Sequence, residues 1–172
     1  MLDLFGGMIA MGGFLNTTVN ETNPGTESEV RCGQVIAALI PAKWVCALVS
    51  PSGHRAAVGG SGATADFIVY TGGNGHDWLT IRTDENYWGT LDAYTPESGN
   101  SGDQAAAMVR DKLSTQATAV IVDLHNFGNE SKRVAIINKV TAMVNKYMEG
   151  RMVIFTFRGA TEILNPDRSF RA

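Results

Sequence analysis

The alternation of apolar and polar positions predicts three strands in the middle of the chain. Asp66–Tyr70 (DFIVY) is a short β-rich run, and Trp78–Arg82 (WLTIR) alternates as a half-buried strand does. Tyr87–Tyr94 (YWGTLDAY) predicts the third strand. Alternation places Trp88, Thr90, Asp92 and Tyr94 on one face of that strand, and Tyr87, Leu91 and Ala93 on the other.

Helical periodicity replaces this alternation farther along the chain. Ser101-Gly-Asp-Gln104 has the form of a capping box, in which Ser and Gln side chains satisfy free backbone N–H groups, so a helix is expected to start there. Ser131–Met148 repeats apolar residues at helical spacing, and Gly150 supplies a stop. Further strands are expected at Ala119–Leu124, Met152–Phe157 and Thr161–Leu164.

The order of these elements predicts an α+β fold. Three strands precede an alternation of helix and strand, which favours a central, mostly antiparallel sheet with two packed helices. A small apolar, glycine-rich helical region is expected to precede this sheet. The length of 172 residues is enough for a core that needs no disulfide or metal.

The first 62 residues differ in composition from the rest. They hold only three of the 14 Lys and Arg, four of the 17 Asp and Glu, and ten of the 19 Gly. The change falls at Gly59-Gly60-Ser61-Gly62, a run typical of a flexible joint. We therefore expect an N-terminal delivery region at 1–62 and a second domain at 63–172.

Two apolar runs lie in this first region, at residues 1–15 and 35–49, with the polar segment 16–29 between them. Both runs are shorter than the roughly 20 residues that span a bilayer, so no stable membrane span is expected. Two small buried helices are the plain interpretation, and a membrane-active segment is the alternative. Cys32 and Cys46 fit no zinc pattern, and either a single disulfide or two buried thiols is expected.

The net charge of −3 excludes a protein that coats nucleic acid nonspecifically, but not an enzyme with a local basic face. P-loop, zinc-protease and serine-hydrolase motifs are absent from the sequence. Polar residues instead gather where the expected strands end. They are His76, Asp77, Arg82, Asp92, Tyr94, Thr95, Asp123, His125, Arg158 and Thr161.

This set suits RNA cleavage without a metal or other cofactor. A histidine can take the 2′-OH proton, an acid can protonate the leaving oxygen, and a cation can hold the charge on phosphorus. His76 and His125 are the acid–base candidates, and Arg82 is the cation. Lys112, Arg158 and Ser98 are candidates for binding the substrate.

One segment resembles a known family. Asp92-x-Tyr94-x-Pro96 with Ser98 precedes a capped helix, and Gln116-Ala117 then leads into an apolar strand. This arrangement is similar to the C-terminal ribonuclease domain of contact-dependent growth inhibition toxins, within the group that includes barnase and the colicin ribonucleases. The resemblance covers about residues 65–124, although His125-Asn126 stands where the family often has acidic residues and a serine.

The resemblance implies a secreted or surface-delivered toxin domain that cleaves tRNA in the cytoplasm of a target cell and is bound by a cognate immunity protein. It implies that Asp92 and Tyr94 line the site. Thr95, one of the polar residues at the strand ends, is a further catalytic candidate. The tRNA species, the cleavage position and the immunity protein are not specified by the sequence.

Two other interpretations use the same chain. Asp66 followed by Asp92-x-Tyr94 has the outline of the PD-(D/E)xK nuclease site, in which two acids bind Mg²⁺. Tyr94 stands where that pattern has lysine, so Lys112 would have to supply the amine from the following helix. The third interpretation is a non-enzymatic interaction or immunity-type protein, which the acidic balance favours slightly.

Overall fold

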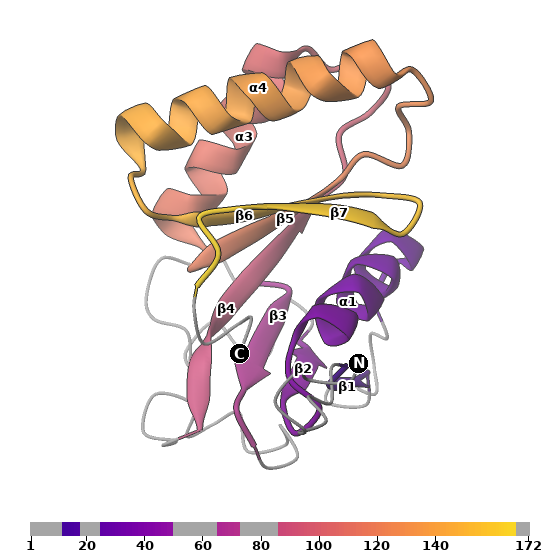
Figure 1. Ribbon diagram of the computed structural model, residues 1–172, viewed down its shortest axis with the longest axis vertical. Helices are drawn as coiled ribbons and strands as arrows, with labels where there is room; N and C mark the ends of the chain where they lie inside the picture. The colour runs from indigo at the N-terminus through magenta and orange to yellow at the C-terminus, as the bar shows by residue number, and fades with distance from the viewer. Residues whose placement is uncertain (1–11, 18–24, 50–64, 73–85, 168–172) are drawn as a thin grey trace, which may run out of the picture.

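The computed structural model describes residues 12–17, 25–49, 65–72 and 86–167, which form one seven-stranded sheet with helices on both faces (Figure 1). Strands that are consecutive in the chain are also neighbours in the sheet, from β1 at one edge to β7 at the other. The elements are β1 (Phe14–Asn16), α1 (Glu27–Leu39), β2 (Val45–Leu48), β3 (Phe67–Tyr70), β4 (Tyr87–Tyr94), α3 (Gly102–Thr115), β5 (Ala119–Asp123), α4 (Glu130–Tyr147), β6 (Met152–Phe157) and β7 (Ala160–Leu164).

The expected α+β fold is confirmed. The pairs β2–β3, β3–β4 and β6–β7 are antiparallel, whereas β1–β2, β4–β5 and β5–β6 are parallel. The two later parallel pairs follow from the helices α3 and α4, because each crosses over the sheet and returns the chain in the same direction. The carboxyl ends of β4, β5 and β6 therefore meet at one edge of the sheet.

The sheet separates two hydrophobic cores. Alternate residues of β5 and β6, such as Val122 and Phe155, pack under α3 and α4. The intervening residues, such as Ile121 and Ile154, pack against α1 on the opposite face. The helix starts follow the sequence signals, since Ser101 and Gln104 form the predicted capping box of α3. Because alternate residues of each strand face opposite cores, only side chains on the same face of the sheet can come together at the strand ends.

The N-terminal region contains one described helix, α1, and it also adds two strands to the sheet. The helix starts in the segment that the sequence indicated as a polar connection, at a second capping box made by Thr26 and Glu29. The apolar run at 35–49 is not a single helix: it is divided between the end of α1 and β2, and Pro41 lies between them. Strand β2 pairs with β3, so residues from both sides of position 62 share one sheet.

Other expectations lie outside the described residues. In the N-terminal part these concern the apolar start at 1–11 and the Gly59–Gly62 run, and in the second part the strand expected at Trp78–Arg82. The functional division at residue 62 stays a prediction.

The alternation expected for β4 is wrong at its start. Tyr70 pairs with Tyr87 and Val69 pairs with Gly89, so an irregularity around Trp88 changes the register. As a result Trp88 packs on the α1 side with Leu91, while Tyr87 packs on the other side with Tyr70. A local bulge adds one residue to a strand and reverses the alternation before it.

Both cysteines are buried free thiols, so the described structure supports that alternative rather than the disulfide. Burial raises the pKa of each thiol, which keeps both protonated and unreactive at neutral pH. Within the part of the chain that the structure describes, no helix has the length and apolar character to cross a membrane.

Arg151 connects the end of α3 to the start of β5. Its Nη2 donates to the carbonyl oxygens of Leu113 and Ala117, at 2.8 and 2.7 Å, and its Nε donates to that of Thr118 at 3.1 Å. We expect Arg151→Met to lower the free energy of unfolding by about 2–3 kcal/mol, because three carbonyls lose a charged donor. Urea denaturation measures this loss, with Lys43→Met on an exposed loop as the control. Equal losses in the two variants would contradict the prediction.

Candidate functional site

Two carboxylates meet on the face of the sheet that carries α3. Asp92 lies in β4 and is 1% exposed. Its neighbours Leu91 and Ala93 pack toward α1, so Asp92 faces the opposite way. Asp66 immediately precedes β3, and its Oδ2 accepts the backbone N–H of Ala93 at 2.8 Å. Because β3 and β4 are antiparallel, the start of β3 lies beside the second half of β4 and brings the two acids together.

The closeness of these acids changes the protonation of Asp66. Burial and, next, a side-chain hydrogen bond with Asp92 and the charge of Asp92 raise the pKa of Asp66 from 3.8 to about 8. The N–H of Ala93 opposes this shift. At neutral pH, Asp66 therefore holds a proton that a nearby divalent cation would displace.

Lys112 completes this group, which we call the acid–lysine cluster: Asp66, Asp92 and Lys112. The lysine extends from α3, and its Nζ donates to Asp92 Oδ2 at 2.6 Å. Its side chain is 17% exposed, compared with 2% for that of Asp92. The lysine thus stands between the buried acid and solvent, where its ammonium group can also meet a substrate phosphate.

Tyr94 lies two residues beyond Asp92 on β4 and packs with the core under α3 and α4. It lines a hollow of about 670 Å³ between the end of β4 and α3. Burial, followed by the charge of Glu97, raises the pKa of its phenol, so Tyr94 remains a neutral hydrogen-bonding group. The other lining residues are Thr95, Glu97, Asn100, Gln104, Ala107, Met108 and Asp111.

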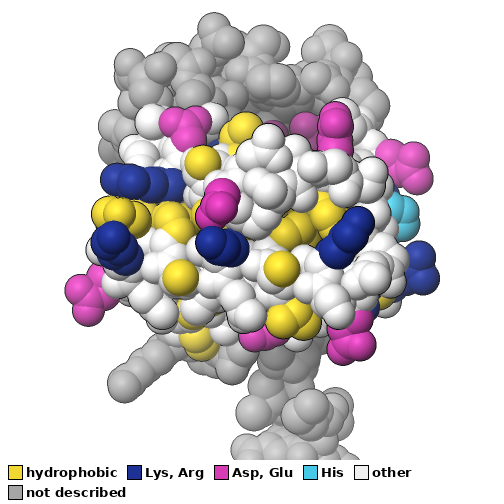
Figure 2. All heavy atoms as spheres, turned by 90° about the horizontal axis from the view of Figure 1, so that it is seen from above, with side chains coloured by type: hydrophobic (Ala, Val, Ile, Leu, Met, Phe, Trp, Pro, Cys, Tyr) yellow, Lys and Arg dark blue, Asp and Glu magenta, His cyan; other side chains and the backbone are white. Residues whose placement is uncertain are grey.

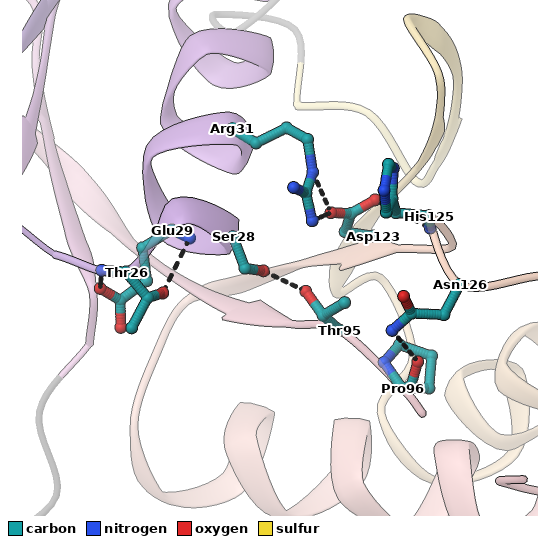
Figure 3. Close-up of polar contacts among 9 residues, drawn as sticks. All are labelled: Thr26, Ser28, Glu29, Arg31, Thr95, Pro96, Asp123, His125 and Asn126. Carbon is teal, nitrogen blue, oxygen red and sulfur yellow. Dashed lines mark hydrogen bonds and ion pairs between the residues drawn. The ribbon is translucent and has the colours of Figure 1, made fainter. Parts of the chain in front are cut away.

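A second polar group lies on the α1 side of the sheet (Figure 3). Arg31 of α1 approaches Asp123 at the end of β5, with Nη2 and Nε at 2.7 and 2.8 Å from Oδ2. Asp123 Oδ1 accepts the backbone N–H of His125 at 3.0 Å. The hydroxyl groups of Ser28 and Thr95 also form a hydrogen bond here. We call this the arginine–histidine cluster: Ser28, Arg31, Thr95, Asp123 and His125.

The structure thus divides the predicted site residues between two faces. Asp92, Tyr94 and Lys112 lie on the α3 side, whereas His125 and the hydroxyl of Thr95 belong to the α1 side, although Thr95 also lines the hollow beside α3. Ser98 is exposed in the loop before α3. Arg158 lies in the exposed β6–β7 turn, with Cζ 4.9 Å from the ring centre of Phe157. His76 and Arg82 lie outside the described residues.

Sequence reasoning missed Arg31 and Ser28. Both lie in the region interpreted as a delivery segment, and the hydrogen bonds joining them to Asp123 and Thr95 cross 92 and 67 residues of sequence. The one local signal was the capping box that starts with Thr26, which marks the beginning of α1. It could have revealed the helix but not its partner strands.

The acid–lysine cluster fits a magnesium ion in part. Within the described residues, no group of three or more His, Cys, Asp and Glu side chains is arranged to hold a metal. Mg²⁺ in phosphate-processing sites, however, needs only one or two carboxylates, with water and substrate phosphate as the remaining ligands. Asp66 and Asp92 can supply those two carboxylates; the pKa of Asp66 is raised mainly by burial and then by the hydrogen bond with Asp92 and the charge of Asp92, the last of which a cation would offset.

Comparison with known proteins found a weak structural similarity and no sequence match. No family model matches the chain, and no curated protein matches it. A chain of the CdiA-CT/CdiI toxin and immunity complex from Burkholderia pseudomallei aligns with 90% of this chain and 100% of its own length. The identity is 18% and the TM-score is 0.48. We therefore base the functional proposal on the residues of this chain.

Proposed function

We propose that this chain is a nuclease that hydrolyses a phosphodiester with Mg²⁺ bound at Asp66 and Asp92. The observation that carries the proposal is that buried Asp92 lies beside half-buried Asp66, just before the adjacent strand, and accepts a hydrogen bond from Lys112 of the following helix. This group has the outline of a PD-(D/E)xK site. Tyr94 stands where that pattern has its lysine, and Lys112 supplies the amine instead.

Each residue of the acid–lysine cluster has a separate task. Asp66 and Asp92 would hold the ion, which supplies charge neutralisation at the phosphate and lowers the pKa of a bound water. Lys112 lies 2.6 Å from Asp92 and can donate to a phosphate oxygen as negative charge develops on it. Tyr94, beside the hollow, can orient the nucleotide next to the scissile bond.

The resemblance found in the sequence adds the biological setting to this proposal. It points to tRNA as the substrate, to a toxin domain delivered into a target cell, and to a cognate immunity protein as partner. In that setting residues 1–62 would serve in delivery, while Arg31 of the same region also contacts β5 in the fold.

A metal-free ribonuclease remains the second candidate, because the arginine–histidine cluster favours it. His125 is exposed and lies beside the Arg31–Asp123 ion pair, so an acid–base group and a cation are close together (Figure 3). In this mechanism the 2′-OH attacks phosphorus and leaves a 2′,3′-cyclic phosphate.

Incubation of the whole chain with total tRNA in EDTA and in Mg²⁺ tests the proposal. We expect no cleavage in EDTA, cleavage in Mg²⁺, and linear phosphomonoester ends rather than cyclic phosphates, because water is the nucleophile. Cleavage that survives EDTA and is lost in His125→Ala would replace the proposal with the metal-free mechanism. Folded protein that cleaves in neither condition would favour an interaction protein.

A further inference from the structure

The outer surface of the α3–α4 layer carries a row of basic side chains. Lys132, Lys139 and Lys146 are spaced seven residues apart on α4, so they lie on nearly the same face of the helix. Arg110 of α3 joins the row near its end, with Cζ 4.2 Å from the ring centre of Tyr147. We call these four residues the basic ridge. Figure 2 shows Lys and Arg side chains in a row across this surface, with hydrophobic side chains between them.

Charge is segregated onto this ridge. The whole chain has a net charge of −3, yet α4 carries one acidic residue and four basic ones, three of which are in the ridge. Asp103 contacts the ridge, with its Oδ1 3.1 Å from Lys139 Nζ. Both side chains in this pair are more than half exposed, so the pair contributes little to stability and can be exchanged for another anion.

An exposed aromatic ring lies at the end of the ridge. Tyr147 is 50% exposed, and Lys146 Nζ lies 4.9 Å from its ring centre, beside the guanidinium of Arg110. Cations next to an exposed aromatic face are the combination with which proteins hold nucleic-acid backbones and stack unpaired bases. On a helix face that contacts only solvent, an exposed tyrosine ring would bring no benefit, because it exposes apolar surface to water.

We propose that the basic ridge binds the phosphate backbone of a folded RNA whose scissile strand enters the acid–lysine cluster. This inference rests on the proposed nuclease function and adds the surface that holds its substrate. Lys132 and Lys146 are about 21 Å apart along the helix, so the ridge can contact several phosphates of one RNA strand. Arg110 and Lys112 are two positions apart on α3 and project from different sides of it, so this helix separates the end of the ridge from the site.

This geometry separates binding from cleavage. Arg110, the ridge residue on α3, packs on Tyr147 at the end of α4, whereas Lys112 of the same helix reaches Asp92 of β4. A dinucleotide in the cluster would not extend around a helix about 10 Å across, but a folded RNA would. Loss of ridge charges should therefore raise KM for folded RNA and leave the cleavage of a dinucleotide unchanged.

Binding of a fluorescent 2′-O-methyl RNA hairpin in EDTA tests the inference without cleavage by either mechanism. For Lys146→Gln we expect affinity to fall by about fivefold, and the slope of log affinity against log salt to decrease by about 1. Lys132→Gln/Lys146→Gln should roughly double the change in slope. Lys43→Gln, which removes the same charge from an exposed loop, is the matched control and should bind as the wild type does.

Asp103→Asn provides a test in the opposite direction. Removal of this acid frees Lys139, so RNA affinity should rise by about twofold or more. If Lys132→Gln/Lys146→Gln and Lys43→Gln bind the hairpin with the same affinity, the inference is overturned. An acidic protein is then the partner that the charge of this surface fits. Failure of the proposed nuclease function is distinguishable, because it appears as absence of Mg²⁺-dependent cleavage while the ridge variants still lose RNA affinity.

Discussion

The Asp66→Asn protein is expected to lose Mg²⁺-dependent nuclease activity by about 100-fold or more, and to be more stable than the wild type at pH 8. The loss follows because one of the two carboxylates that would hold the ion becomes a neutral amide. Charge stabilisation by a metal ion is worth several kcal/mol, and each ~1.4 kcal/mol changes the rate tenfold.

The gain in stability follows from the proton that Asp66 holds. Its pKa is raised from 3.8 to about 8 in the folded chain, so the folded state keeps a proton that the unfolded state releases above about pH 4. The contribution of Asp66 to stability is therefore fully present below that pH and is lost as the pH rises toward 8. Asparagine cannot ionise, and it can still accept from Ala93 and donate to Asp92.

Urea denaturation at pH 4, 6 and 8 measures this effect. The difference between Asp66→Asn and the wild type should be small at pH 4, grow through pH 6 and reach a few kcal/mol at pH 8, since each pKa unit is worth about 1.4 kcal/mol. Glu162→Gln, on the exposed edge strand β7, is the control and should show no such trend. A difference that is the same at pH 4 and pH 8 would show that Asp66 ionises normally.

Replacement of Lys112 by methionine should destabilise the chain by about 3–5 kcal/mol, because it leaves the charge of Asp92 buried without its cation. Methionine keeps most of the length of the lysine side chain, so the change in packing is small. Cleavage should also be lost, since the ammonium group next to the phosphate is removed. Urea denaturation and the tRNA assay in Mg²⁺ measure the two effects.

A double substitution separates the two roles of Lys112. In Lys112→Met/Asp92→Asn no buried charge is left unpaired at this position, so we expect most of the stability to return. Cleavage should remain absent, because both the lysine and one metal ligand are missing. If Lys112→Met alone were as stable as the wild type, the prediction would be wrong, because Lys112 would not be the cation that stabilises the buried charge of Asp92.

The sequence alone was sufficient for the elements whose signals are local. The capping box at Ser101, the apolar run of β5 and the helical repeat of α4 are each encoded within about 20 residues, and each appears in the structure close to its expected bounds. Local signals failed where tertiary contacts decide. The register around Trp88 depends on pairing with β3, and the apolar run at 35–49 divides because β2 completes the sheet.

Residue types at the site followed from the sequence, but their grouping did not. Asp66, Asp92 and Lys112 were recognisable as the parts of an acid–lysine pattern, whereas Thr95 and His125 were expected beside Asp92, and the hydroxyl of Thr95 and the side chain of His125 lie on the opposite face. The difference arises because alternate residues of a strand point to opposite faces. Arg31 reaches Asp123 only through the packing of α1 under the sheet.

The sequence by itself determined the fold class, the N-terminal cap of α3, the helical repeat of α4, and a set of polar residues at strand ends. Only the tertiary structure decided which of these residues meet, because strand pairing and helix packing join positions that are 20 to 92 residues apart in the chain. It also decided that Asp66 holds a proton, since that follows from burial beside Asp92. The order of charged residues along the chain does not show which of them become neighbours once the strands pair.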